Sequence, residues 1–344
     1  MTAQPPPSSA APAPEPIMVV RHLSVSYRGT TGVIPAVRDV SFDLHAGEVL
    51  ALVGESAAGK TTVGQAMLRL MPPQTIVTGD VRYRGRSVAS MSSEELRRVR
   101  GDEVTMIFQD PIAALTPTLP IGDQLAEVYI EHRGLDRVAA RAAAVGMLAP
   151  MFRDAERVAA AFPFQVSGGM AQRIMFAIAT ALHPAVIIAD EPTAALDPAV
   201  RGELLEQLEA QRNAGVAVLL ITHDFGVVAR LADRVAVMYA GAVVETGDVR
   251  TIFQRPRHPY TLGLLQSLPS IAHRGRLVPM RGQPPDLATL DVECPFLPRC
   301  AKATSICRVE SAPALTAADT GAPGHEVACY NPIAVDRASM EASE

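Results

Sequence analysis

Short apolar runs recur along the chain and predict the strands of one core. The segments 17–29 and 36–54 alternate apolar and polar positions before they become wholly apolar, and another apolar run covers 104–109. The later runs are AVIIAD, VAVLLIT, RVAVMYA and AVVETG, which begin at Ala185, Val216, Arg234 and Ala242. Alternating and short continuous apolar runs are typical of half-buried and fully buried strands.

Between the early and the late runs the pattern becomes helical. From about residue 121 to 183 the chain is rich in alanine, and its apolar residues recur at helical spacing, as in VAARAAAVGMLAPMF and MAQRIMFAIATALH. Strands and helices that alternate around one core predict an α/β fold. We expect the helical stretch to be an inserted subdomain.

The composition excludes several classes of protein. Hydrophobic residues make up 48% of the 344 residues and charged residues 19%, and the formal net charge is −5, so we predict a folded protein without affinity for nucleic acid. No apolar run approaches the roughly 18 residues that a membrane span needs. Residues 1–16 are rich in Pro and Ala and lack the apolar segment of a signal peptide, so we expect a disordered leader and a cytosolic protein.

A glycine-containing loop lies between a strand pattern and a helix pattern. The stretch GESAAGKTT fits GxxxxGK[ST], in which backbone N–H groups surround nucleotide phosphates at the start of a helix. The flanking runs at 48–53 and 63–70 supply the required strand and helix, and an ordinary turn would not need the lysine. The nucleotide-binding candidates are therefore Gly54, Glu55, Ser56, Ala57, Ala58, Gly59, Lys60, Thr61 and Thr62.

Two adjacent acids end a later apolar run. Asp190 closes AVIIAD, where its carboxylate can hold the water shell of an Mg²⁺ ion bound through Thr61. Glu191 follows directly and can orient or deprotonate the water that attacks a γ-phosphate. Two neighbouring buried carboxylates need a cation or a catalytic task. The alternative interpretation is an exposed acidic turn before Pro192.

Further motifs follow in a characteristic order: IFQDP, VSGGMAQR, AALD at 194–197 and THD. Each is weak evidence alone, but with the phosphate loop and the acidic strand they resemble the motifs of the ATP-binding cassette (ABC) ATPases over about residues 17–269. The resemblance implies a P-loop NTPase core of the RecA-like type, with an antiparallel β subdomain and the inserted helical subdomain. We expect this ATPase domain to cover 17–254.

The resemblance also implies roles for individual residues. Gln109 and His223 match the glutamine and the switch histidine of the family, so the catalytic candidates are Glu191, His223 and Gln109. Mg²⁺ would be held by Thr61, Gln109 and Asp190. The remaining residues that the resemblance places around ATP are Tyr27, which would stack on adenine, Ser167, Gly168, Gly169 and Gln172 of the signature, and Asp197. In this family two cassettes face head to tail, and ATP lies between the phosphate loop of one and the signature of the other.

The chain changes character beyond Gln254. FQRPRHPYTLGLLQSLP and CPFLPRCAKATSIC resemble the C-terminal region of the oligopeptide, dipeptide and nickel importers. This resemblance implies an ATP-hydrolysing subunit that powers peptide import, peripheral on the cytoplasmic side of the cell membrane. Its partners would be a second ATPase subunit, two permease subunits and an external substrate-binding protein. The segment after Gln109 would contact the permease subunits. A nickel or metal-chelate importer, a soluble ABC ATPase outside transport and an unpaired regulatory subunit remain alternatives.

All four cysteines lie in this tail, which we expect to form a small extension over 255–344. They are Cys294, Cys300, Cys307 and Cys329. Their spacing lacks the CxxC pairs of zinc ribbons, and disulfides are rare in the cytosol. Thiolates commonly hold iron–sulfur clusters, and the importer resemblance implies a [4Fe-4S] cluster. Zinc and four unligated thiols remain alternatives. We expect the cysteine site to lie away from ATP, because every catalytic motif precedes the tail.

Two positions of the phosphate loop depart from the importer pattern. Ala57 and Ala58 stand where that subfamily usually has Gly and Ser. A left-handed alanine costs about 1 to 2 kcal/mol. The substitutions are therefore free of strain only if both residues have φ below zero.

Overall fold

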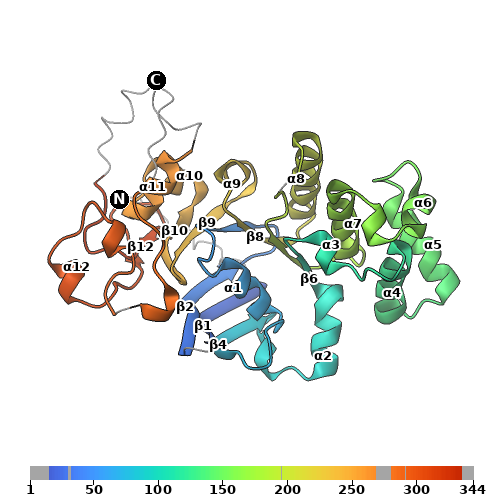
Figure 1. Ribbon diagram of the computed structural model, residues 1–344, viewed down its shortest axis with the longest axis horizontal. Helices are drawn as coiled ribbons and strands as arrows, with labels where there is room; N and C mark the ends of the chain where they lie inside the picture. Colours follow the sequence, from blue (N-terminus) through green and yellow to red (C-terminus); the bar gives the residue numbers. More distant parts are fainter. Residues whose placement is uncertain (1–14, 30–31, 195, 269–279, 291, 335–344) are drawn as a thin grey trace, which may run out of the picture.

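The computed structural model describes residues 15–29, 32–194, 196–268, 280–290 and 292–334 (Figure 1). The leader expected over 1–16 lies almost entirely outside the described residues. Within them, no helix combines the length and the apolarity that crossing a bilayer requires.

The smaller of two sheets is antiparallel and has the strand order β2-β1-β4-β5. Its strands are β1 (Met18–Gly29), β2 (Gly32–Leu44), β4 (Ile76–Tyr83) and β5 (Arg86–Ser87). The long pairing of β1 with β2 explains the alternating pattern of the first segment, because one face of this sheet is buried and the other is solvated.

The larger sheet has the order β11-β12-β10-β9-β3-β8-β7-β6. The strands from β9 to β6 are parallel, whereas β10, β12 and β11 extend the sheet in antiparallel fashion. Its strands are β3 (Val49–Val53), β6 (Val104–Ile107), β7 (Val186–Asp190), β8 (Ala217–Thr222), β9 (Arg234–Tyr239), β10 (Ala242–Asp248), β11 (Thr316–Ala317) and β12 (Glu326–Val327).

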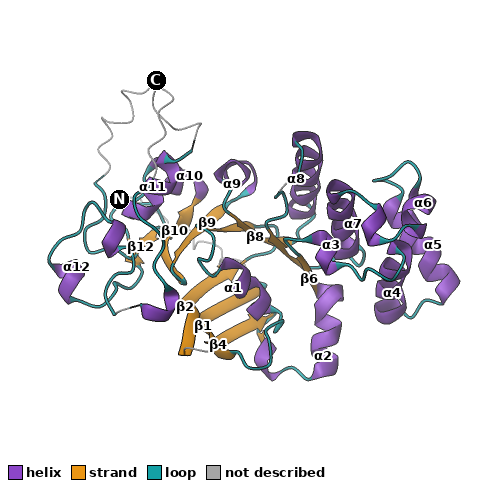
Figure 2. Ribbon diagram, viewed as in Figure 1, coloured by secondary structure: helices purple, strands orange, loops and turns teal. Residues whose placement is uncertain are grey.

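Helices cover both faces of the parallel strands. Leu50 and Leu52 of β3 point to α1 (Lys60–Met67) and the smaller sheet, whereas Val49, Ala51 and Val53 join a second core cluster with α7 (Gly168–Thr180), α8 (Pro198–Asn213) and α9 (Phe225–Leu231). Burial on both faces explains why these strands read as continuous apolar runs. Figure 2 shows α1 between the two sheets and the longer helices α7 and α8 beside the larger sheet.

The stretch expected to be helical contains four helices at one end of the molecule (Figure 1). The α-helices within the described residues are α1 (Lys60–Met67), α2 (Ser93–Arg98), α3 (Pro111–Ala114), α4 (Ile121–Arg133), α5 (Arg137–Leu148), α6 (Ala155–Ala160), α7 (Gly168–Thr180), α8 (Pro198–Asn213), α9 (Phe225–Leu231), α10 (Val249–Gln254), α11 (Pro259–Gln266) and α12 (Ile306–Val309).

The tail is attached to the larger sheet by a buried polar cluster around Glu245 of β10. The Glu245 carboxylate accepts hydrogen bonds from the backbone N–H groups of Arg257 and His258, at 2.6 and 2.9 Å. It also lies 2.8 Å from Nε2 of His325, and both side chains are wholly buried. One carboxylate thus joins the turn before α11 to the segment that leads into β12.

Candidate functional site

The phosphate loop connects β3 to α1, and its shape depends on two glycines. A Cβ atom on Gly54 would lie 2.2 Å from the carbonyl oxygen of Met238, and one on Gly59 would lie 2.3 Å from that of Ala36. Both glycines also have positive φ, which disfavours any L side chain. Gly59 precedes α1 without a side-chain cap, so the first N–H groups of this helix remain available to an anion.

A cavity of about 340 Å³ opens over this loop. Gln109 and Glu191 line it together with the loop, so the structure brings these sequence-predicted residues to one place. The complete lining is Ala36, Ser56, Ala57, Ala58, Gly59, Lys60, Thr61, Thr62, Gln109, Glu191 and Leu287. Leu287 belongs to the tail and was not anticipated from the sequence.

Lys60 is held against the loop that it follows. Its Nζ donates to the carbonyl oxygens of Gly54 and Glu55, at 2.8 and 2.9 Å, and the residue is only 7% exposed. Burial lowers the pKa of Lys60, while Glu191, Asp190 and Glu55 act to raise it. Phosphate oxygens can replace the two carbonyls as acceptors, because the ammonium group has three donors and a flexible stem.

Asp190 places a buried carboxylate at the end of β7. It is 1% exposed, and its Oδ1 atom has no hydrogen-bond partner in the described structure. Burial raises the pKa of Asp190 and the Glu191 charge adds to this rise, whereas a hydrogen bond from Thr61 and the Lys60 charge oppose it. An unpartnered carboxylate oxygen beside a hydroxyl matches the hard oxygen ligands that Mg²⁺ prefers.

Glu191 is fixed by the turn that follows β8. Its Oε1 lies 2.7 Å from Nδ1 of His223, and its Oε2 accepts from the Thr222 hydroxyl at 3.3 Å. Glu191 is 9% exposed and has a left-handed φ of 46°, a strained conformation for a residue with a side chain. Thr222 was missed from the sequence, although its place at the end of an apolar strand, beside His223, was a usable signal.

The residues predicted from the signature motif lie elsewhere. Ser167 caps α7 by accepting from the Met170 N–H at 3.3 Å, and Figure 1 shows α7 apart from α1. None of the signature residues lines the cavity over the phosphate loop. Gln172 is 3% exposed, so its side chain does not face a ligand in this conformation.

Two further candidates, Tyr27 and Asp197, do not line the cavity. The Tyr27 hydroxyl is 3.2 Å from Oγ1 of Thr62, so its ring approaches the phosphate loop without lining the cavity. Asp197 is exposed and caps α8 through the N–H groups of Ala199 and Val200. Residue 195 of the AALD motif lies outside the described residues.

The tail contacts the nucleotide site, although none of its four cysteines lines the cavity over the phosphate loop. Leu287 lines the cavity over the phosphate loop, and the guanidinium of Arg299 donates to the Glu55 carboxylate within the loop. The tail therefore reaches the loop directly. Motif order along the chain did not reveal this, because the contact joins residues that are 244 positions apart.

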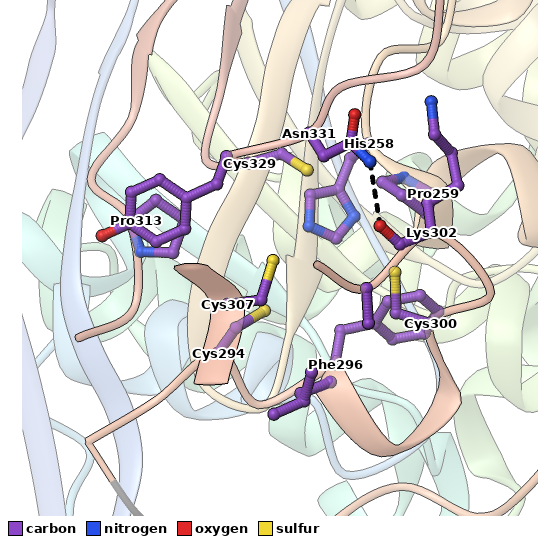
Figure 3. Close-up of a pocket in the computed structure, with 13 residues that line it drawn as sticks. His258, Pro259, Cys294, Phe296, Cys300, Lys302, Cys307, Pro313, Cys329 and Asn331 are labelled. Atoms are coloured by element: carbon purple, nitrogen blue, oxygen red, sulfur yellow. Dashed lines mark hydrogen bonds between the residues drawn. The ribbon is translucent and has the colours of Figure 1, made fainter. Parts of the chain in front are cut away.

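The four cysteines line one small cavity in the tail (Figure 3). Its volume is about 20 Å³, which is room for about one water molecule. Burial raises the pKa of Cys329 to about 11, so this thiol is protonated at neutral pH unless a metal displaces the proton. Within the described ranges no three His, Cys, Asp or Glu side chains are arranged to hold a metal ion. The donor type suits a thiolate-bound centre, but the observed arrangement does not form one.

Ala57 does not have the negative φ that an alanine needs to be free of strain at this position. Its φ is 63°, in the left-handed region, whereas Ala58 is not among the residues with positive φ. Ala57→Gly is therefore expected to raise the free energy of unfolding by about 1 kcal/mol, because glycine adopts this conformation without strain. Urea unfolding measures the change, and Ala58→Gly is the matched control, which should lower the stability. An Ala57→Gly variant no more stable than the wild type would contradict the strain argument.

Comparisons with known proteins agree with this arrangement. Residues 37–194 match the family described as "ABC transporter", and residues 244–307 match "Oligopeptide/dipeptide transporter, C-terminal region". The chain is 44% identical to the dipeptide transport ATP-binding protein DppD of Bacillus subtilis, over 85% of this chain and 89% of that protein. It is 39% identical to the oligopeptide transport ATP-binding protein OppD of Salmonella typhimurium, over 94% of this chain and 97% of that protein.

Solved structures resemble the chain over about two thirds of its length. A dimeric bacterial ABC transporter cassette superimposes with a TM-score of 0.61 and 27% sequence identity, covering 68% of this chain and 99% of that one. The same cassette in a post-hydrolysis state bound to ADP and Pi gives the same TM-score. The fold prediction, a P-loop ATPase core with an antiparallel sheet and a mainly parallel sheet, is confirmed.

Proposed function

The chain belongs to the ABC transporter family, and we propose that within it the protein is the ATP-hydrolysing subunit of an importer that carries peptides across the cytoplasmic membrane. The observation that carries the ATPase assignment is the meeting of Lys60, Gln109 and Glu191 in one cavity at the ends of parallel strands. The match of residues 244–307 to the oligopeptide and dipeptide transporter tail supports peptides as the cargo.

The residues around the cavity divide the work of ATP hydrolysis. The loop N–H groups and Lys60 would bind the phosphates, and Thr61, Gln109 and Asp190 would hold Mg²⁺. Mg²⁺, when bound, neutralises charge on the phosphate oxygens. Glu191 orients the attacking water and accepts its proton, while His223 and Thr222 fix the carboxylate in place. Tyr27 stacks on the adenine.

The separation of the signature from the phosphate loop supports a two-subunit site. Ser167, Gly168 and Gly169 open α7 away from the cavity, so they are free to meet ATP held by a second ATPase subunit, together with Asp197. The solved cassette that resembles this chain is itself dimeric. ATP binding then closes the pair and hydrolysis opens it. Two permease subunits convert this motion into transport on the cytoplasmic side, and an external binding protein supplies the substrate.

The test is uptake by vesicles that contain the chain with its permeases and binding protein. We expect ATP-dependent uptake of a labelled peptide, and ATPase activity that rises when the peptide-loaded binding protein is added. Uptake of nickel without uptake of peptide would support the metal-chelate importer instead. ATPase activity that never depends on the membrane partners would favour a soluble ATPase.

Substitution in the segment between Gln109 and α4 should separate transport from hydrolysis. Leu119 is 40% exposed and lies where we expect the permease contact. Leu119→Ser should lower peptide uptake about tenfold and leave the basal ATPase activity of the isolated subunit within about twofold, because the contact couples two sites without taking part in the chemistry. Val33→Ser, at an exposed apolar position of β2, is the matched control. Equal loss of both activities would point to a folding role.

We further propose that the four tail cysteines hold a [4Fe-4S] cluster, with zinc as the alternative. Support comes from the four thiols that line one cavity and from the thiolate preference of such clusters. Anaerobically purified protein should contain about four iron atoms per chain, as the cluster formula requires. Cys300→Ser should lose the iron, while the exposed neighbour Ser305→Ala should keep it. Stoichiometric zinc in a colourless protein would replace the cluster by a zinc site, and a metal-free protein would leave four unligated thiols.

A further inference from the structure

We infer that Arg299 of the tail is a positioning residue of the nucleotide site, which fixes the phosphate loop and neutralises the Glu55 carboxylate within it. The inference rests on the proposed ATP binding at this loop. It assigns to the cysteine-bearing tail a direct part in nucleotide affinity.

The contact between Arg299 and Glu55 is bidentate. Nη1 of Arg299 donates to Oε2 of Glu55 at 2.7 Å, and Nη2 donates to Oε1 at 2.9 Å. Nε donates to the Arg281 carbonyl at 3.0 Å, and Nη1 also donates to the Tyr239 hydroxyl at 3.3 Å. The Arg299 side chain is only 4% exposed. A planar guanidinium with all three nitrogens engaged holds one orientation, so its partner carboxylate is held as well.

A second residue of the tail, Tyr260, holds the backbone of Glu55. The N–H of Glu55 donates to the hydroxyl of Tyr260 at 2.8 Å, and Tyr260 of α11 is wholly buried. The ring of Tyr260 packs on Tyr239 at 4.6 Å and on Phe296 at 5.5 Å, measured between ring centroids. Phe296 lies between Cys294 and Cys300 in the sequence. The loop is therefore fastened to the tail through both the side chain and the backbone of one residue.

The charge of Glu55 gives this contact a consequence for phosphate binding. The Glu55 carbonyl accepts from Nζ of Lys60 at 2.9 Å, so its carboxylate belongs to the loop that surrounds the phosphates. A negative charge here, 27% exposed, would repel nucleotide phosphates unless a cation compensates it. Arg299 provides that cation, and the hydrogen bond to Glu55 raises the pKa of Arg299 so that it stays charged.

The position of Arg299 couples the loop to the cysteine cavity. Cys300 follows it directly and lines that cavity, so a change that moves this segment also moves the guanidinium. Coupling between two sites is reciprocal in free energy. ATP bound at the loop should therefore favour the same arrangement of the cysteine segment.

The test compares charge variants by titration with a fluorescent ATP analogue and by steady-state ATPase kinetics. Arg299→Gln is expected to raise both Kd and KM about tenfold, a typical size of coupling between sites, and to change kcat by less than about twofold. The double variant Glu55→Gln/Arg299→Gln should recover most of the affinity, because it removes both charges. The affinity of Arg299→Lys for the analogue should lie between those of the wild type and Arg299→Gln. Arg308→Gln, which changes an exposed arginine of the tail, should bind like the wild type.

Three outcomes would overturn the inference. One is wild-type affinity in Arg299→Gln. Another is a double variant that binds as weakly as Arg299→Gln, because Arg299 would then only support the fold of the tail. Thermal unfolding checks that each variant is folded, and if Arg299→Gln is not, Arg299→Lys and the double variant carry the comparison. The third is a wild-type chain that fails to bind ATP, which would remove the proposed function too, whereas the first two leave that function intact.

Discussion

Glu191→Gln should retain ATP binding and lose about 10²- to 10⁴-fold in turnover, the usual contribution of a positioned general base. The amide keeps the shape of the side chain and can still pair with His223, but it cannot accept a proton from water. Phosphate release measures the loss. Nucleotide-dependent dimerisation should persist, because the groups that hold the phosphates are unchanged.

One feature of the site makes this variant informative. Glu191 is held between His223 and Thr222, so the substitution alters the chemistry with little change in position. Glu156→Gln, at an exposed position of α6, controls for the loss of a charge. If Glu191→Gln released phosphate at nearly the wild-type rate, the catalytic base would be another group.

Glu245→Leu is expected to lower the free energy of unfolding by about 3 to 5 kcal/mol, because it leaves buried donors without their acceptor. Two backbone N–H groups and Nε2 of His325 depend on this carboxylate. The tail should detach first. Urea unfolding measures the stability, and limited proteolysis should release fragments from the chain beyond Gln254.

Glu326→Gln is the matched control for this prediction. Glu326 is exposed on β12, close to the buried cluster, and its side chain takes no part in it. We expect a change of less than about 0.5 kcal/mol there. A Glu245→Leu protein with wild-type stability and a protease-resistant tail would show that the cluster does not hold the tail.

Much of the parallel core could be predicted from the sequence because burial on both faces leaves a continuous apolar run. The meeting of the motif residues at the strand ends could be predicted as well, because the carboxyl ends of parallel strands share one edge of a sheet. The buried cluster around Glu245 could also have been predicted from the strand pattern. Glu245 occupies the buried face of an alternating strand, where a charged residue needs partners.

Other features were beyond the reach of the sequence. Ala57 has a left-handed φ, which no local propensity of alanine would have indicated. The contact of Arg299 with Glu55 joins two distant segments whose pairing leaves no periodic trace. The four cysteines of the tail line one cavity, but their spacing does not specify what they bind.

The attachment of β12 to β10 has a consequence for solubility. Without the tail, β10 would be the last strand on its side of the larger sheet, and Glu245 and Thr246 would lose their pairing with β12. Such an open edge recruits strands from other molecules and promotes aggregation. Among the described residues the outermost strand on this side is β11, which has two residues and is too short to template another strand. A catalytic fragment that ends at Gln254 should therefore precipitate where the full-length protein stays in solution.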